Sequence, residues 1–234
     1  KIENFDSLIL KVNSTTNNYN LVKNSNGKIT SEGIFVNKEL NASNTDGINT
    51  TNMKGLVTNN ATINIDNGLY TNKGESDNNS TITINSEYVN DSLLINYGTI
   101  INNNIYKNNA TTENKFNATI TNYKNFTNNN LVKNYGTLEN NTSGALTGVI
   151  ENKGIIKNLK NGNNLGIINT HTSIINDSLL INESKVRNYK NATITNNNTI
   201  TNKDKFYNYG QITNNSSLET QVEFHNYNLV TNNK

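Results

Sequence analysis

An apolar residue followed two positions later by asparagine recurs every six residues over much of this chain. In two of the longest runs, the apolar residues are Ile120, Phe126, Val132 and Leu138, and Ile194, Ile200, Phe206 and Ile212. A helix repeats every 3.6 residues and a strand every two, so a period of six fits neither a single helix nor one long strand. It fits a coil of short strands with a corner after each strand, which is the organisation of a solenoid.

The composition alone favours disorder. About a quarter of the 234 residues are Asn, only 32% are hydrophobic, and the mean hydropathy is -0.69. Polar chains of this kind usually bury too little apolar surface to fold. The regular spacing predicts order instead, because stacked coils place one apolar residue over the next and so build a continuous core.

Strand alternation assigns each position of the six. The apolar residue at position one faces inward, the residue at position two faces outward, and the Asn at position three faces inward beside the corner. Glycine at position five, as in Gly98, Gly136 and Gly210, is expected to supply the positive φ of a tight corner. The predicted core comprises Ile120, Phe126, Val132, Leu138, Ile150, Ile156, Ile174, Leu180, Val186, Ile194, Ile200, Phe206 and Ile212.

The inward asparagines are predicted to form a ladder. Their amides can bond to one another along the stack and to backbone groups at the corners, which are otherwise hard to satisfy. The predicted ladder comprises Asn122, Asn134, Asn152, Asn176, Asn188, Asn196, Asn202, Asn208 and Asn214.

A tyrosine column predicts the size of one coil. At steps of eighteen residues, the outward position after Asn is occupied by tyrosine five times out of eight, at Tyr97, Tyr135, Tyr189, Tyr209 and Tyr227. Two of the steps are twenty residues long, and both contain the same insertion, Asn-Ala-Thr-Ile-Thr-Asn, at 117–122 and 191–196. Three hexads per coil therefore predict an all-β, parallel β-helix of roughly triangular cross-section, of either hand.

The column has two interpretations. Exposed aromatic side chains could bind sugar rings or a protein partner, because tyrosine offers contact area at low entropic cost. Alternatively, the side chains form a ladder on one face that stabilises the stacking of coils.

The simplest domain organisation is one solenoid over 1–234. The regular hexads occupy 88–234, whereas 1–70 keep the composition but not the strict spacing. No linker or change of composition separates the two parts.

No catalytic or metal-binding constellation is evident. The hexads resemble those of left-handed β-helix acyltransferases in period only, and His171 and His225 fall in outward positions, where ordinary surface residues are expected. The carboxylates are scattered, there is no cysteine, and no Walker, GxSxG or HExxH motif occurs. We expect no enzyme activity, no metal and no cofactor.

Charge and hydropathy bear on the partners. The net charge is +2 with both signs interspersed, so nucleic-acid binding is not expected. Arg187 is the only arginine, so bidentate binding of phosphate or carboxylate is not expected as a repeated feature of the surface. No apolar run approaches the roughly 18 residues of a membrane span, so membrane insertion is not expected either.

The repeat style resembles a known class of surface protein. Asn-Tyr-Gly-Thr-Ile at 96–100, Asn-Tyr-Gly-Thr-Leu at 134–138 and Asn-Tyr-Gly-Gln-Ile at 208–212 recur among Ile-Thr-Asn triplets over about the last 145 residues. This style is similar to the passenger domains of Asn-rich autotransporter adhesins and to adhesin-like surface proteins. The resemblance implies an extracellular or cell-surface stalk that binds a glycan or protein on a host or neighbouring cell.

Other functions remain open. The chain could be a subunit of an extracellular filament that associates end to end, because an uncapped coil exposes strand edges. A carbohydrate-active β-helix enzyme is less favoured, since no outward cluster of carboxylates is found. An ice-binding solenoid is also less favoured, because the outward threonine array at Thr195, Thr213 and Thr231 spans only three coils.

Overall fold

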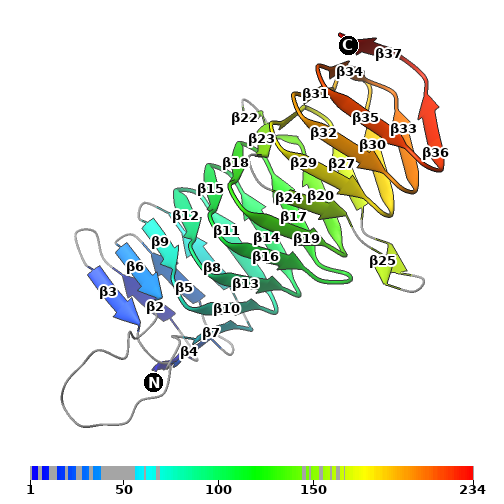
Figure 1. The fold of residues 1–234 in the computed structure, drawn as a ribbon. Helices are drawn as coiled ribbons and strands as arrows, with labels where there is room; N and C mark the ends of the chain where they lie inside the picture. The colour runs from blue at the N-terminus through cyan, green and yellow to red at the C-terminus, as the bar shows by residue number, and fades with distance from the viewer. Residues whose placement is uncertain are drawn as a thin grey trace, which may run out of the picture.

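The computed structural model shows three parallel sheets wound as one solenoid, with its coils stacked along a common axis (Figure 1). It describes the backbone of residues 2–4, 7–10, 15–18, 21–24, 28–31, 34–37, 56–60, 62–66, 69–143, 146–147, 149–152, 155–158, 160–161, 164–165 and 167–233. Side chains are described for residues 57–60, 62–66, 69–141, 149–150, 152, 156, 158 and 168–233.

Each sheet forms one face of the solenoid and contains eleven strands. Face A contains β1 (Ile2–Asn4), β4 (Leu21–Asn24), β7 (Leu56–Asn59), β10 (Glu75–Asn78), β13 (Leu93–Asn96), β16 (Thr111–Asn114), β19 (Leu131–Asn134), β24 (Ile155–Asn158), β29 (Leu179–Asn182), β32 (Thr199–Asn202) and β35 (Ser217–Thr220). Face B contains β2 (Ser7–Leu10), β5 (Lys28–Ser31), β8 (Thr62–Ile65), β11 (Thr81–Ile84), β14 (Thr99–Asn102), β17 (Thr119–Asn122), β20 (Thr137–Asn140), β27 (Ile167–Thr170), β30 (Lys185–Asn188), β33 (Lys205–Asn208) and β36 (Glu223–Asn226). Face C contains β3 (Thr15–Asn18), β6 (Ile34–Asn37), β9 (Leu69–Asn72), β12 (Glu87–Asn90), β15 (Ile105–Asn108), β18 (Asn125–Asn128), β23 (Val149–Asn152), β28 (Ser173–Asn176), β31 (Thr193–Asn196), β34 (Gln211–Asn214) and β37 (Leu229–Asn232).

The predicted fold class is confirmed. The described residues contain strands and no helix, and successive strands of a face pair in parallel, for example Ser76 with Leu94 and Leu94 with Thr112, eighteen residues apart. The less regular start contributes strands β1 to β8 to the same three sheets. The steps there are longer: Ile2 pairs with Val22, and Val22 with Val57.

The core consists of the inward residue at position one of each hexad, and the thirteen predicted core residues are all buried. Face C carries an aromatic column inside the solenoid that the sequence analysis did not single out. The Tyr70 ring stacks on Tyr88 at 4.8 Å between centroids, Tyr88 meets Tyr106 edge to face, and Tyr106 stacks on Phe126 at 4.7 Å. These tyrosines also precede Asn by two positions, so the hexad register itself places them inside.

The inward asparagines form three ladders, one beside each corner, and all nine predicted members are buried. Where the next coil also has an Asn, the Nδ2 donates to its Oδ1, as in Asn96 to Asn114 at 2.8 Å and Asn114 to Asn134 at 2.8 Å. The same Nδ2 groups donate to corner carbonyls, such as that of Thr137 from Asn114. Buried polar side chains are costly unless paired, so the ladders explain how so many amides fit inside a folded chain.

Two insertions shift the coils relative to the predicted column. The antiparallel hairpin β21–β22 (Thr142–Ser143 and Leu146–Thr147) leaves the solenoid at the corner between faces B and C. The hairpin β25–β26 (Lys160–Asn161 and Asn164–Leu165) leaves it two corners later, between faces A and B. A step that contains one hairpin is 24 residues long, so Asn134 stacks under Asn158 and Asn158 under Asn182. The step from Asn140 to Thr170 on face B contains both hairpins and is 30 residues long. Each hairpin adds six residues to the coil, which is the length of one hexad. The period of six therefore continues in the sequence, but the strands after the hairpin lie on a different face from the one that the period alone predicts.

The glycine corners have a different cause from the one predicted. Among the described residues, the non-glycine residues with positive φ are Asn117 and Asn191, at 64° and 70°, within the two-residue insertions. Gly136 and Gly210 lie one coil later, where an added Cβ would approach the carbonyl oxygens of Ala118 and Ala192 to 2.3 Å. Close approach of backbone, not positive φ, requires glycine there.

Candidate functional site

The predicted tyrosine column is divided between two corners, which corrects the prediction. Tyr97 and Tyr135 follow strands of face A, whereas Tyr189, Tyr209 and Tyr227 follow strands of face B. The hairpins cause the division, because they move the later residues by two hexads relative to the earlier ones. We call the later set, together with His171, the aromatic corner.

The aromatic corner is built of stacked pairs of rings. His171 stacks on Tyr189 with centroids 4.1 Å apart, and Tyr209 stacks on Tyr227 at 4.7 Å and 3°. Tyr209 is 39% exposed and Tyr227 is 61% exposed. Since the facing rings cover one another, the corner presents ring edges and hydroxyl groups outward. This geometry favours a ladder that stabilises stacked coils over a platform on which sugars stack.

The earlier pair of tyrosines does not form such a stack. Lys115 occupies the same corner in the coil between Tyr97 and Tyr135, and its Nζ lies 5.9 Å from the centre of the Tyr135 ring. The Lys115 ammonium also bonds to Glu113. The Lys115 ammonium therefore takes part both in an ion pair with Glu113 and in a cation–π contact with Tyr135.

Glu113 is the centre of a small charge network on face A. It accepts hydrogen bonds from Lys115 and from Lys133, the latter at 2.7 Å. Burial alone would raise the pKa of Glu113, but the two lysines outweigh it and the pKa is lowered. Asp77 on the same face has the opposite shift, because burial and then the Glu75 carboxylate raise its pKa.

The histidines each lie next to a carboxylate and an aromatic ring. His171 Nε2 is 3.5 Å from Glu139 Oε1, and His225 Nε2 is 3.1 Å from Glu223 Oε2. His225 also stacks on Tyr207 at 5.0 Å. Within the described residues, no group of three or more His, Asp or Glu side chains is placed to hold a metal ion.

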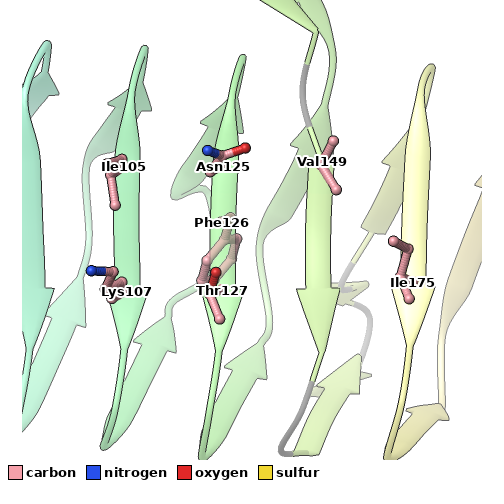
Figure 2. A pocket seen from close by; sticks show the side chains of 7 residues that line it. All are labelled: Ile105, Lys107, Asn125, Phe126, Thr127, Val149 and Ile175. Carbon is pink, nitrogen blue, oxygen red and sulfur yellow. The ribbon is translucent and has the colours of Figure 1, made fainter.

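Face C carries an open hollow of about 380 Å³, drawn in Figure 2. The short outward side chains of Asn125 and Thr127 form its floor together with Phe126, and the flanking strands supply Ile105, Lys107, Val149 and Ile175. The hollow arises because two small residues stand between longer ones on neighbouring coils. It offers a shallow, mixed surface and no convergent set of reactive groups.

Face B carries a threonine column longer than the one noted in the sequence. Five threonines occupy the first position of successive strands in register, namely Thr62, Thr81, Thr99, Thr119 and Thr137. Only the coil geometry identifies them as neighbours, because their spacing alternates between 18, 19 and 20 residues. β-Branched residues favour such pleated, half-buried positions, so the column stabilises the face.

Comparison with known proteins supplies no relative. No protein-family model matches the chain, and no curated protein or solved structure is significantly similar to it. In the part of the chain that the structure describes, no helix is long and apolar enough to cross a membrane.

Proposed function

We propose that this chain is a non-catalytic, adhesive β-solenoid, a stalk or binding surface outside the cell or on its surface. The observation that carries the proposal is the continuous set of Asn ladders, which ties every regular coil to the next through buried side chains. A chain tied in this way is a rod whose stability is a sum over neighbouring coils. Some of its outward residues stack in columns of like side chains, such as the five threonines of face B, and repeat one chemistry over several coils.

A surface that repeats the same side chains along a rod suits an adhesive protein. Columns of like side chains offer a partner several equivalent contacts, and many weak contacts together bind strongly. The partner that we propose is a glycan or a protein on a host or neighbouring cell. The resemblance to Asn-rich adhesins and the absence of cysteine agree with this setting, and the exposed tyrosine hydroxyls of the aromatic corner are available to it.

A cell-binding assay tests the proposal. The purified chain, fixed to beads, is expected to retain cells or a glycan array, and soluble chain should compete. A variant with Tyr209→Ser and Tyr227→Ser tests whether the aromatic corner contributes to the binding of cells or glycans. Retention of no cell type and no glycan by the folded chain would refute adhesion, whereas unchanged retention by the variant would assign the corner to stability alone.

A second candidate function is end-to-end assembly. In β35 to β37 the core-facing residues Leu218, Phe224 and Val230 are only partly buried, and Leu229 is 51% exposed. A further coil stacked on this surface would cover them, whether it comes from the same chain or from another copy. Light scattering at rising concentration separates the candidates, because a constant mass excludes growth by stacking of this chain.

A further inference from the structure

Three cations converge on face B near the C-terminal end of the rod. Lys185 and Arg187 both point outward from β30, and Lys205 of β33 pairs in register with Lys185. Neighbouring strands lie about 4.8 Å apart, so the two ammonium groups emerge side by side. Tyr207 pairs in register with Arg187 and completes the group, which we call the cationic patch.

The patch makes no ion pair, whereas several other cations on the rod do. Lys107, Lys133 and Lys203 each lie within hydrogen-bonding distance of a carboxylate, at 2.8, 2.7 and 3.2 Å. Among the described residues, no carboxylate forms an ion pair with Lys185, Arg187 or Lys205. Burial, followed by the charges of Arg187 and Lys205, lowers the pKa of Lys185, and the nearby Asp204 carboxylate offsets only part of this effect.

A second, independent feature lies beside the patch. Asn169 of β27 pairs in register with Arg187, and its side-chain oxygen is buried without a hydrogen-bond partner. A buried acceptor of this kind is costly and calls for an explanation such as a ligand. Because this oxygen is buried, a ligand can reach it only after the Asn169 amide turns outward. A ligand that fits must then bring a hydrogen-bond donor to Asn169 and an anionic group to the three cations.

We infer that the cationic patch, with Asn169, binds a polysaccharide that carries carboxylate groups, such as a uronic-acid polymer. A uronic-acid ring carries hydroxyl donors and a carboxylate together, which matches both features. The fork of Arg187 suits a carboxylate, and two lysines in register can hold the same group from the side. This inference rests on the proposed adhesive function and names the ligand of one of its surfaces.

Nucleic acid fits the patch less well. The faces of Tyr207 and His225 are stacked on each other at 5.0 Å and 8°, so a base has no open pair of rings between which to insert. The phosphodiester backbone of DNA carries no hydroxyl donor for Asn169. Glu223, in register with Lys205, repels a polyuronate as well as a nucleic acid, so it does not distinguish the two ligands.

Binding to polygalacturonate tests the inference, with fully methyl-esterified polygalacturonate as the uncharged control. The unmodified chain should bind the acid polymer and not its ester, and single-stranded DNA should bind more weakly. Lys185→Gln, Arg187→Gln and Lys205→Gln should each weaken binding about tenfold, as expected for one charge-assisted contact. The triple patch variant combines these three substitutions and should lose binding. The control variant, Lys107→Gln with Lys133→Gln and Lys203→Gln, removes the same net charge as the triple patch variant from other surfaces and should bind normally.

Stability provides a second readout that distinguishes a ligand site from folding damage. Lys185→Gln relieves repulsion and Asn169→Leu removes the unpaired oxygen, so both variants should melt at or above the temperature of the unmodified chain while binding less. Equal binding to the ester or to DNA, equal loss in the control variant, or full binding by the triple patch variant would overturn the inference. If the triple patch variant still retains cells, adhesion stands through another surface; if the chain binds polygalacturonate but retains no cells, the proposed function fails and this site remains.

Discussion

Asn188 pairs in register with Thr170 of the preceding coil, and its buried Oδ1 receives no hydrogen bond. In the neighbouring coils an Asn fills the position of Thr170, and its Nδ2 donates to the next oxygen, as Asn188 itself does to Asn208 at 2.7 Å. Asn140, one coil earlier, donates its Nδ2 to the Thr172 hydroxyl at 2.8 Å and to the Ser173 carbonyl at 2.7 Å, and reaches the Thr170 hydroxyl only at 3.5 Å. The ladder of face B is therefore interrupted at a single coil, next to the second hairpin.

Thr170→Asn should restore this ladder. The new amide would donate to Asn188 Oδ1 and accept from Asn140, in a space that Asn occupies in other coils. We expect the free energy of unfolding to rise by about 1 kcal/mol, the net value of one buried hydrogen bond. Urea denaturation followed by circular dichroism measures it. Thr170→Val, which supplies no donor, is the matched control, and an equal gain in both variants would show that packing and not the ladder is responsible.

Gly136→Ala should destabilise the rod because of contact with backbone. The added Cβ would lie 2.3 Å from the carbonyl oxygen of Ala118 and 2.4 Å from that of Lys115, and neither oxygen can move without displacing the corner below. Overpacking of this kind costs about 1–3 kcal/mol. Asn117→Gly, in the corner beneath, is the control and should be tolerated, because glycine adopts its φ of 64° readily. A melting temperature for Gly136→Ala equal to that of the unmodified chain would contradict the close approach.

The period of six was sufficient to predict the short strands, the inward asparagines and the core. The period could not predict the two hairpins, because an insertion of six residues leaves a repeat of six residues unchanged in the sequence. Thus Tyr135 and Tyr189, which the count placed in one column, belong to different corners. The aromatic column inside face C was within reach of the same reasoning, since Tyr88 and Tyr106 each stand two residues before a ladder Asn.

The cationic patch illustrates a different limit of the sequence. Lys185 and Arg187 alternate on one strand, so their common face could be predicted, and Lys205 lies at a step of twenty across an insertion. What the sequence could not show is that these cations lack carboxylate partners, or that Asn169 has an unpaired oxygen. Both depend on which residues meet across coils, and the hairpins change that register.

Acid should weaken the rod through Glu113. Its folded pKa lies below the ordinary value, so its contribution to stability is present above the unfolded pKa of about 4.3 and is lost as the pH falls through the folded pKa. Glu113→Gln should therefore lower the melting temperature at neutral pH, and its effect should fade as the pH falls through the lowered folded pKa. Glu87→Gln, which breaks an exposed pair with Lys107, should cause a smaller change at neutral pH. A deficit of Glu113→Gln that persists unchanged in acid would argue against the ion pairs as its cause.

Ile200→Asp should unfold the coils that surround residue 200. Ile200 is fully buried on β32 and pairs in register with Leu180 and Leu218, so an aspartate there would place an unpaired carboxylate in the core. A buried charge without a partner costs several kcal/mol, and because coils are stabilised by their neighbours, the damage should spread to adjacent coils. Hydrogen exchange should show loss of protection over β29, β32 and β35 first. Thr201→Asp, the outward neighbour, keeps its carboxylate in water and should melt close to the unmodified chain, so equal damage from both substitutions would mean that the inward and outward positions have been exchanged.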